Sequence, residues 1–175
     1  LQEVSRRIRG PQGMPVEVVV RRPGEPAPLV FTISREPIRV PAVDARVVEG
    51  QTGYVHLHHL GSGATVQFRR ALQDLQARGM RALVLDLRGN GGGSVTDVSN
   101  IVDYLFPQPV KWAYEWRASA GLGAPTESSP REQTYAGPVL LLTDPGCVSA
   151  CDITAAVLER LGRAKLVGEP PAGAS

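Results

Sequence analysis

The feature that most constrains the fold is a regular alternation of short apolar runs and amphipathic segments after residue 63. The apolar runs have the near-continuous hydrophobic character of buried strands and cover residues 81–88 (RALVLDLR), 138–144 (PVLLLTD) and 164–169 (AKLVGE). The amphipathic segments have helical spacing and cover residues 64–79, 94–106 and 151–162. Buried strands separated by helices pair in parallel, and residues 45–60 add the pattern of a hairpin. The sequence therefore predicts an α/β fold with a mixed sheet flanked by helices.

The N-terminal part has a different pattern. Residues 1–9 predict the end of an amphipathic helix, and two β-rich runs follow at residues 15–22 and 29–34. This unit buries too little apolar surface to stand alone, and the proline-punctuated segment 37–43 predicts a linker to a larger domain over residues 44–175. Because the chain begins within a helical pattern, we expect it to be a fragment or a mature form of a longer protein.

One long stretch, residues 117–136, is polar and rich in Gly, Pro and Ser. We predict a surface loop there, which in a compact domain is often functional.

A glycine-rich turn follows the first of the three apolar runs. Four of the five residues from Gly89 to Gly93 are glycine, and a helical pattern begins directly after them. Glycines permit close approach to the backbone amides, and a helix N-terminus adds partial positive charge. These features suit a phosphate cradle or an oxyanion hole, while the spacing matches neither a dinucleotide-binding motif nor a Walker loop. An ordinary tight turn is the structural alternative.

A second strand-turn-helix junction contains Ser149 in the stretch PGCVSACD. Ser149 is interpreted either as the cap of the following helix or as a nucleophile aimed from the turn, with the amide of Ala150 as an oxyanion donor. Cys147 and Cys151 flank it at a spacing that is borderline for a disulfide, and no metal-ligand cluster surrounds them. We interpret both cysteines as small packed residues.

The two junctions together resemble the carboxyl-terminal processing peptidases, or tail-specific proteases, which are serine peptidases. The resemblance rests on residues 53–60 (GYVHLHHL), 68–93 and 138–169, in that order along the chain. It implies a crotonase/ClpP-like sheet preceded by a partial PDZ lobe over residues 1–36, which retains the last helix and strands of that domain. It further implies a serine endopeptidase that cleaves unstructured protein tails with a free C-terminus, acts in the periplasm or outside the cell, and needs no metal or organic cofactor.

The resemblance also assigns site residues. The family motif D-L-R-x-N-x-G-G matches residues 86–93, and it implies that the amide of Gly92 contributes to the oxyanion hole. The family's serine run aligns with residues 146–152, which makes Ser149 the nucleophile that forms the acyl-enzyme and Ala150 the second oxyanion donor.

The chain departs from the family pattern after Val167-Gly168-Glu169. The family places its general-base lysine shortly downstream, and here that position is Ala174. Three explanations of the missing lysine are open. A lysine could lie beyond Ser175, a different residue could be the base, or the chain could be a peptidase-like protein that binds peptides without cutting them. Lys165 is a poor base because it lies within a predicted strand, away from the strand's carboxyl end.

Histidine is chemically suited to the missing role, because its ordinary pKa lies near neutrality. His56 and His58 alternate on one face of the strand pattern at residues 53–60, and His59 lies on the other. His56 or His58, oriented by Glu169, is therefore the second candidate constellation, and solvated surface histidines are its structural alternative.

The net charge of the chain is small. The 175 residues carry 19 basic and 17 acidic side chains, for a net charge of +2, so nucleic acid is not an expected partner. No apolar run is long enough to predict a transmembrane segment. The pattern of residues does not predict an oligomeric state.

Overall fold

The computed structural model describes residues 2–37, 40–119 and 121–173. The chain divides into two compact units, Leu1–Val40 and Pro41–Ser175.

The smaller unit consists of one helix and one hairpin. Helix α1 (Gln2–Ile8) precedes strands β1 (Pro15–Val20) and β2 (Leu29–Ser34), which pair antiparallel from Pro15 opposite Ser34 to Val20 opposite Leu29. The arginine Arg35 connects them, because its Nε donates to Ile8 O at 2.6 Å and its guanidinium also donates to Pro15 O at 2.9 Å. A cation at the end of a helix satisfies carbonyl groups that have no partner within the helix.

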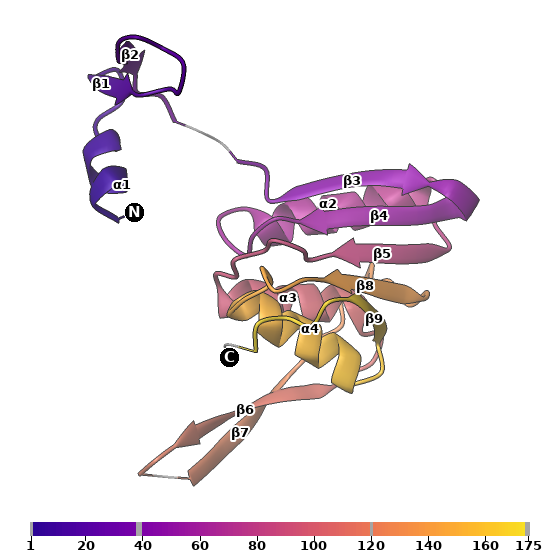
Figure 1. Ribbon diagram of the computed structural model, residues 1–175. Helices are drawn as coiled ribbons and strands as arrows, with labels where there is room; N and C mark the ends of the chain where they lie inside the picture. Colours follow the sequence, from indigo (N-terminus) through magenta and orange to yellow (C-terminus); the bar gives the residue numbers. More distant parts are fainter. Residues whose placement is uncertain (1, 38–39, 120, 174–175) are drawn as a thin grey trace. The chain divides into compact units, whose positions relative to one another are not determined.

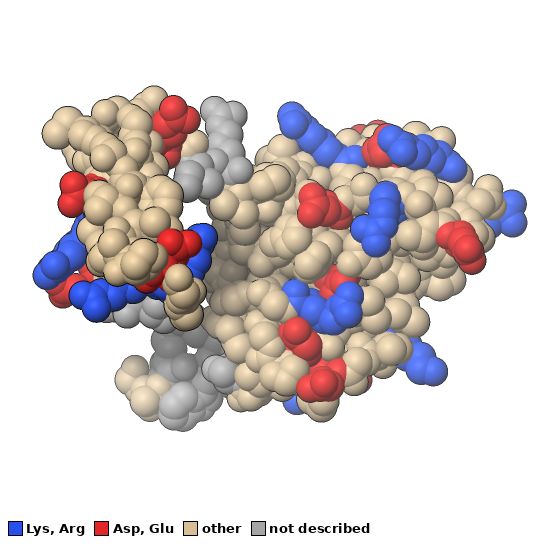
Figure 2. All heavy atoms as spheres, turned by 45° about the horizontal axis from the view of Figure 1, so that its top comes forward, with Lys and Arg blue, Asp and Glu red and all other residues tan. Residues whose placement is uncertain are grey.

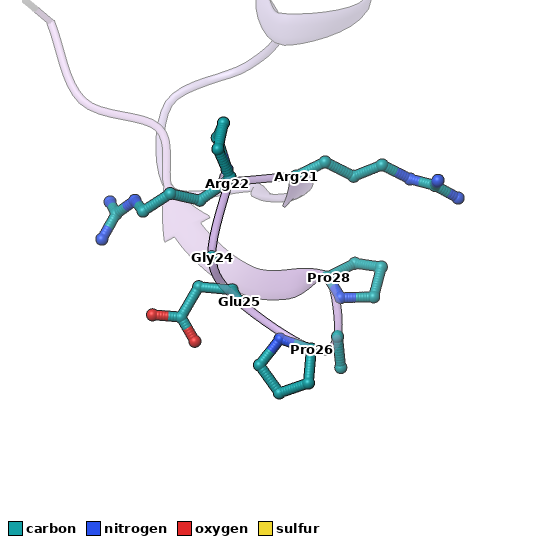
Figure 3. A pocket seen from close by; sticks show the side chains of 8 residues that line it. Arg21, Arg22, Gly24, Glu25, Pro26 and Pro28 are labelled. Carbon is teal, nitrogen blue, oxygen red and sulfur yellow. The ribbon is translucent and has the colours of Figure 1, made fainter.

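The hairpin and the helix enclose an apolar groove of about 720 Å³, whose lining includes Ile8, Val16, Val18 and Ile33. At the other end of the hairpin, residues 21–28 form the connecting loop. The side chains of Arg21 and Arg22 extend from this loop in opposite directions (Figure 3).

The larger unit is built on a five-stranded sheet with the order β3-β4-β5-β8-β9 (Figure 1). These strands are β3 (Val43–Val48), β4 (Thr52–Leu57), β5 (Ala82–Asp86), β8 (Val139–Thr143) and β9 (Ala164–Gly168). The short 3₁₀ turn η1 (Glu49–Gln51) joins β3 to β4, and these two strands pair antiparallel. Strands β4, β5, β8 and β9 are parallel to one another. The predicted α/β architecture with a mixed sheet is confirmed.

Three helices cover the sheet and complete the core. They are α2 (Ala64–Ala77), α3 (Val95–Leu105) and α4 (Ala150–Arg160), with α3 packed between α2 and α4. Alternate strand residues such as Val55, Leu85 and Leu141 are fully buried against them. Each parallel strand ends at the same edge of the sheet, so the turns that follow β4, β5 and β8 lie near one another.

The structure corrects the prediction of a loop over residues 117–136. Strand β6 (Lys111–Arg117) pairs antiparallel with β7 (Gly121–Glu127), and Lys111 lies opposite Glu127. The sequence pattern does not reveal this hairpin, because its second strand is mostly exposed and lacks an alternation of apolar and polar residues; Leu122, for example, is 66% exposed. Its polar composition therefore indicated a loop.

Candidate active site

Ser149 lies on a sharp turn between β8 and α4. Its backbone has φ 57° and ψ −127°, a conformation that costs a residue with a side chain about 1–3 kcal/mol. Ser149 occupies the position before the helix, yet its side chain makes no capping hydrogen bond, and the residue is exposed. The structure thus places the serine in the cap position without the capping bond that position usually provides. A strained strand-to-helix turn is also the arrangement that presents the nucleophilic serine in α/β-hydrolases.

The glycine loop after β5 packs directly against this serine turn. A Cβ added to Gly92, whose φ is 84°, would lie 2.5 Å from Val148 O and 3.0 Å from Ala150 N. Only glycine fits so close to another backbone. The two junctions that the sequence singled out therefore meet, and they bring Gly92, Ser149 and Ala150 together.

The amides of Gly92 and Ala150 differ in availability. Ala150 is the first residue of α4, where a backbone N–H has no acceptor within the helix. The N–H of Gly92 donates to Asn90 Oδ1 at 2.9 Å. An oxyanion at Gly92 would have to share this donor with Asn90 or displace the amide oxygen.

Asn90 connects three segments of the site, a role that the sequence motif did not disclose. Its side chain is fully buried, and its Nδ2 donates to Leu57 O at the end of β4 at 2.7 Å. The backbone carbonyl oxygen of Asn90 accepts a hydrogen bond from Val148 N in the serine turn at 3.2 Å. Since Oδ1 also holds the Gly92 amide, Asn90 fixes the glycine loop relative to both β4 and the serine turn.

The candidate bases lie at the same edge of the sheet as the serine turn. His56 Nε2 lies 3.1 Å from Arg88 O, and His58 Nε2 lies 2.7 Å from Asp44 Oδ2. The two rings are neighbours, with centroids 4.0 Å apart. Within the described ranges, no hydrogen bond connects Ser149 to His56, to His58 or to Glu169.

The segment after β9 also reaches this edge. Glu169 N donates to Thr143 O at 3.1 Å, and Ala172 N donates to Cys147 O at 3.3 Å, so the segment runs beside the serine turn. Lys165 pairs with Leu140 near the start of β9 and lies away from the carboxyl end, as the sequence predicted. Ala174, the position where the family pattern has its lysine, is outside the described residues.

The structure also corrects the interpretation of the cysteines. Cys147 and Cys151 form a disulfide, with Cα atoms 5.3 Å apart. That separation is typical of disulfides. The two cysteines lie on either side of Ser149, whose backbone angles cannot be read from the sequence spacing.

An ion pair between the buried Asp86 and the half-exposed Arg88 directly precedes the glycine loop. Asp86 is fully buried, and it accepts from Arg88 Nη2 at 2.6 Å and from the Tyr54 hydroxyl at 2.6 Å. Burial alone would raise the pKa of this carboxyl, but the hydrogen bonds from Arg88 and Tyr54 outweigh it and lower the pKa to about 2. Burial and the hydrogen bond to the Asp86 carboxylate raise the pKa of Tyr54. Asp86 is therefore an ionised anchor for Arg88 at neutral pH.

An apolar hollow of about 440 Å³ adjoins the serine turn. It is lined by the first turns of α3 and α4 and by the β6–β7 hairpin, through Val95, Thr96, Ser99, Ile153, Trp112, Ala113, Tyr114 and Thr126. Ile153 N donates to Ser149 O at 3.1 Å, so this residue lies one helical turn beyond the serine. The hollow can accept an apolar side chain.

The described residues contain no group of three or more His, Cys, Asp or Glu side chains that could hold a metal ion. No helix in the part of the chain that the structure describes is long and apolar enough to cross a membrane. On the face of the larger unit seen in Figure 2, basic and acidic side chains are interspersed.

The chain is similar to known peptidases over most of its length. Residues 51–175 match peptidase family S41. The chain is 28% identical over 170 residues to the carboxy-terminal processing protease CtpB of Bacillus subtilis, an alignment that covers 95% of this chain and 35% of that protein. It is 32% identical over 179 residues to the carboxy-terminal-processing protease of Bartonella bacilliformis, covering 96% of this chain and 39% of that protein.

A solved structure titled photosystem II D1 C-terminal processing protease has the same fold, with a TM-score of 0.69 and 25% identity. That alignment covers 94% of this chain and 46% of the other. The chain thus spans less than half the length of these relatives. The predicted resemblance to the carboxyl-terminal processing peptidases is confirmed, and the chain belongs to peptidase family S41.

Proposed function

We propose that this chain carries the nucleophile and the oxyanion site of a serine endopeptidase that cleaves unstructured protein tails. The observation that carries the proposal is the exposed, uncapped Ser149 at a strained turn, packed against Gly92 and followed by the Ala150 amide at a helix N-terminus. Membership of family S41 supports the same reaction class.

In the proposed reaction, the hydroxyl of Ser149 attacks the scissile carbonyl and transfers its proton to a general base. The negative charge that develops on the carbonyl oxygen is stabilised by the Ala150 N–H and by the positive end of α4. The protonated base then donates to the leaving amine, which leaves an acyl-enzyme on Ser149 that water hydrolyses. Gly92 supplies the second donor once its N–H turns from Asn90 Oδ1 towards the oxyanion.

For the base, we propose His56 ahead of His58. Among the described residues, the Nε2 of His58 lies 2.7 Å from the carboxylate of Asp44, whereas the Nε2 of His56 lies 3.1 Å from the neutral backbone oxygen of Arg88. Arg88 immediately precedes Gly89, so His56 lies beside the glycine loop. We propose Glu169 as the orienting group; its backbone is fixed to Thr143 at the end of β8, so its side chain would have to reach across β8 and β5 towards β4.

For the substrate, we propose a protein or peptide tail with a free C-terminus. The hollow lined by Thr96, Trp112 and Ile153 would take an apolar side chain near the scissile bond. The apolar groove between α1 and the β1–β2 hairpin is of the kind that a partial PDZ domain over residues 1–36 would contribute to tail binding. A disulfide in so short a turn supports a periplasmic or secreted location, because oxidising compartments preserve disulfides.

The test is cleavage of a folded reporter that ends in an unstructured apolar tail, with the longest natural form of the protein. Ser149→Ala should abolish cleavage, and His56→Ala should reduce kcat by about a hundredfold or more, the usual contribution of a general base. His58→Ala serves as the matched control and should retain most of the activity. Full activity in Ser149→Ala would reject the nucleophile, and full activity in both histidine variants would reject the histidine base.

A further inference from the structure

The disulfide that spans Ser149 has no role in the chemistry described above. Cys147 and Cys151 are the chain's two cysteines, and each lies two residues from the exposed serine. Both are fully buried. The bridge therefore links the residues on either side of Ser149, whose backbone has a positive φ.

The two ends of the bridge are anchored on different elements. Cys147 N donates to Asp144 O at 3.0 Å in the turn after β8, and Cys147 O accepts from Ala172 N. Cys151 lies in the first turn of α4, and its sulfur contacts Leu87 O at 3.6 Å at the start of the glycine loop. A bridge between these anchors fixes the separation of the residues on either side of Ser149.

We propose that the Cys147–Cys151 disulfide is a positioning element that holds Ser149 in its reactive conformation, so that reduction of the bridge lowers the reactivity of the hydroxyl. The inference rests on the proposed function of Ser149 and adds a redox dependence to it. Its basis is the combination of a positive φ at a residue with a side chain, two buried sulfurs around it, and direct packing of Gly92 on the same turn.

A local effect is expected rather than a global one. The stabilisation that a disulfide gives through the unfolded chain grows with the length of the loop it closes, and this loop is very short. What the bridge constrains most is the turn itself. Without it, Ser149 can relax to an ordinary backbone conformation, which moves its Oγ relative to the Ala150 amide.

The redox step is a thiol–disulfide exchange with a dithiol reductant. One thiolate of the reductant attacks a sulfur of the bridge, the protein S–S bond breaks, and a mixed disulfide forms. The second thiol of the reductant displaces the protein sulfur, which leaves two protein thiols and one oxidised reductant molecule. Two electrons pass from the reductant to the protein.

The experiment compares the wild type with Cys147→Ala, Cys151→Ala and the double variant, each in the longest natural form of the protein. The rate of labelling by a small fluorophosphonate reports the reactivity of Ser149, and amide hydrogen exchange over residues 147–151 reports the order of the turn. If the bridge acts as one unit, Ser149 in all three variants should be labelled about tenfold more slowly than in the oxidised wild type, and by equal amounts. Amide hydrogens of the turn should exchange faster, while the thermal midpoint of unfolding should change little.

Dithiothreitol provides a second arm that needs no mutation. The reductant should slow labelling of the wild type and leave the double variant unchanged, with reduction verified by alkylation of the two thiols. Equal labelling rates and equal exchange for the wild type and the double variant would overturn the inference. If Ser149 of the oxidised wild type is not labelled at all, the proposed peptidase function fails, and hydrogen exchange of the turn then decides the positioning role separately.

Discussion

The carboxylate of Asp144 accepts a hydrogen bond from the backbone of Gly89, with 2.8 Å between Asp144 Oδ1 and Gly89 N. The same oxygen accepts from Gly146 N at 2.9 Å. One side chain at the end of β8 therefore holds the glycine loop and the serine turn together. The sequence signal for this contact is only an Asp-Pro-Gly turn, which does not reveal that the aspartate also binds a second turn.

Asp144→Ala should lower kcat by about tenfold to a hundredfold while the substrate KM changes little, because two backbone donors lose a charged acceptor and the oxyanion geometry loosens. Asp144→Asn keeps an acceptor oxygen and should lose less. Steady-state kinetics with a tail peptide measures both values, and thermal unfolding checks that the variants are folded. Equal kcat for Asp144→Ala and the wild type would show that the contact does not position the site.

Gly92→Ala should abolish peptide cleavage. The new Cβ would lie 2.5 Å from Val148 O, and φ is 84° at this position, so the glycine loop must move away from Ser149. Gly91→Ala is the matched control, since a Cβ on Gly91 meets nothing within 4 Å and its backbone is not left-handed. It should keep nearly full activity. A Gly92→Ala protein as active as Gly91→Ala would contradict the close packing of the two turns.

The Asp86 ion pair predicts a specific loss of stability in acid. Its pKa falls from 3.8 to about 2 on folding, so its contribution is complete above pH 3.8 and is lost as the pH falls towards 2. The contribution is on the order of 1–2 kcal/mol, because the carboxylate is buried but its partner Arg88 is half exposed, so solvent screens the pair. Urea unfolding between pH 2 and 5 should therefore show a flatter pH dependence for Asp86→Asn than for the wild type.

Tyr54→Phe provides the control for this effect. It removes one hydrogen bond to Asp86 while leaving Arg88 in place, so its pH dependence should lie between the other two. Identical slopes in all three proteins would mean that Asp86 does not carry the acid sensitivity.

Filling the hollow beside the serine should change substrate preference. Thr96→Trp places a large side chain in a space of about 440 Å³ and should lower kcat/KM about tenfold or more for tails with a bulky apolar residue at the cleavage site, with less effect on small residues. Val66→Trp, on the exposed surface of α2, is the control and should leave the preference unchanged. Cleavage of a peptide series separates these outcomes, and an unchanged preference in Thr96→Trp would exclude the hollow as a substrate site.

The sheet and the meeting of the two turns follow from the sequence because their signals are local and strong. Leu83, Leu85 and Leu141 lie in apolar runs that can only be buried, and parallel pairing then brings Gly92 and Ser149 to one edge. The N-terminal helix and hairpin follow in the same way from spacing and proline positions.

Other features depend on tertiary contacts that leave no local signal. The β6–β7 pairing joins polar, exposed residues, and the Cys147–Cys151 bridge depends on a backbone angle at Ser149 that no spacing rule encodes. The buried links through Asn90 and Asp144 are likewise contacts between distant segments. Sequence motifs locate such residues but do not reveal their partners.

The central claim is that Ser149 is an activated nucleophile. Incubation with a fluorophosphonate, followed by mass spectrometry of the peptide that contains residues 146–152, measures this directly. We predict one covalent adduct per chain, located on Ser149, with none in Ser149→Ala and strongly reduced labelling in Gly92→Ala but not in Gly91→Ala. An absence of adduct on Ser149 in the full-length, folded, oxidised protein, or equal labelling of the Ser149→Ala variant, would contradict the claim.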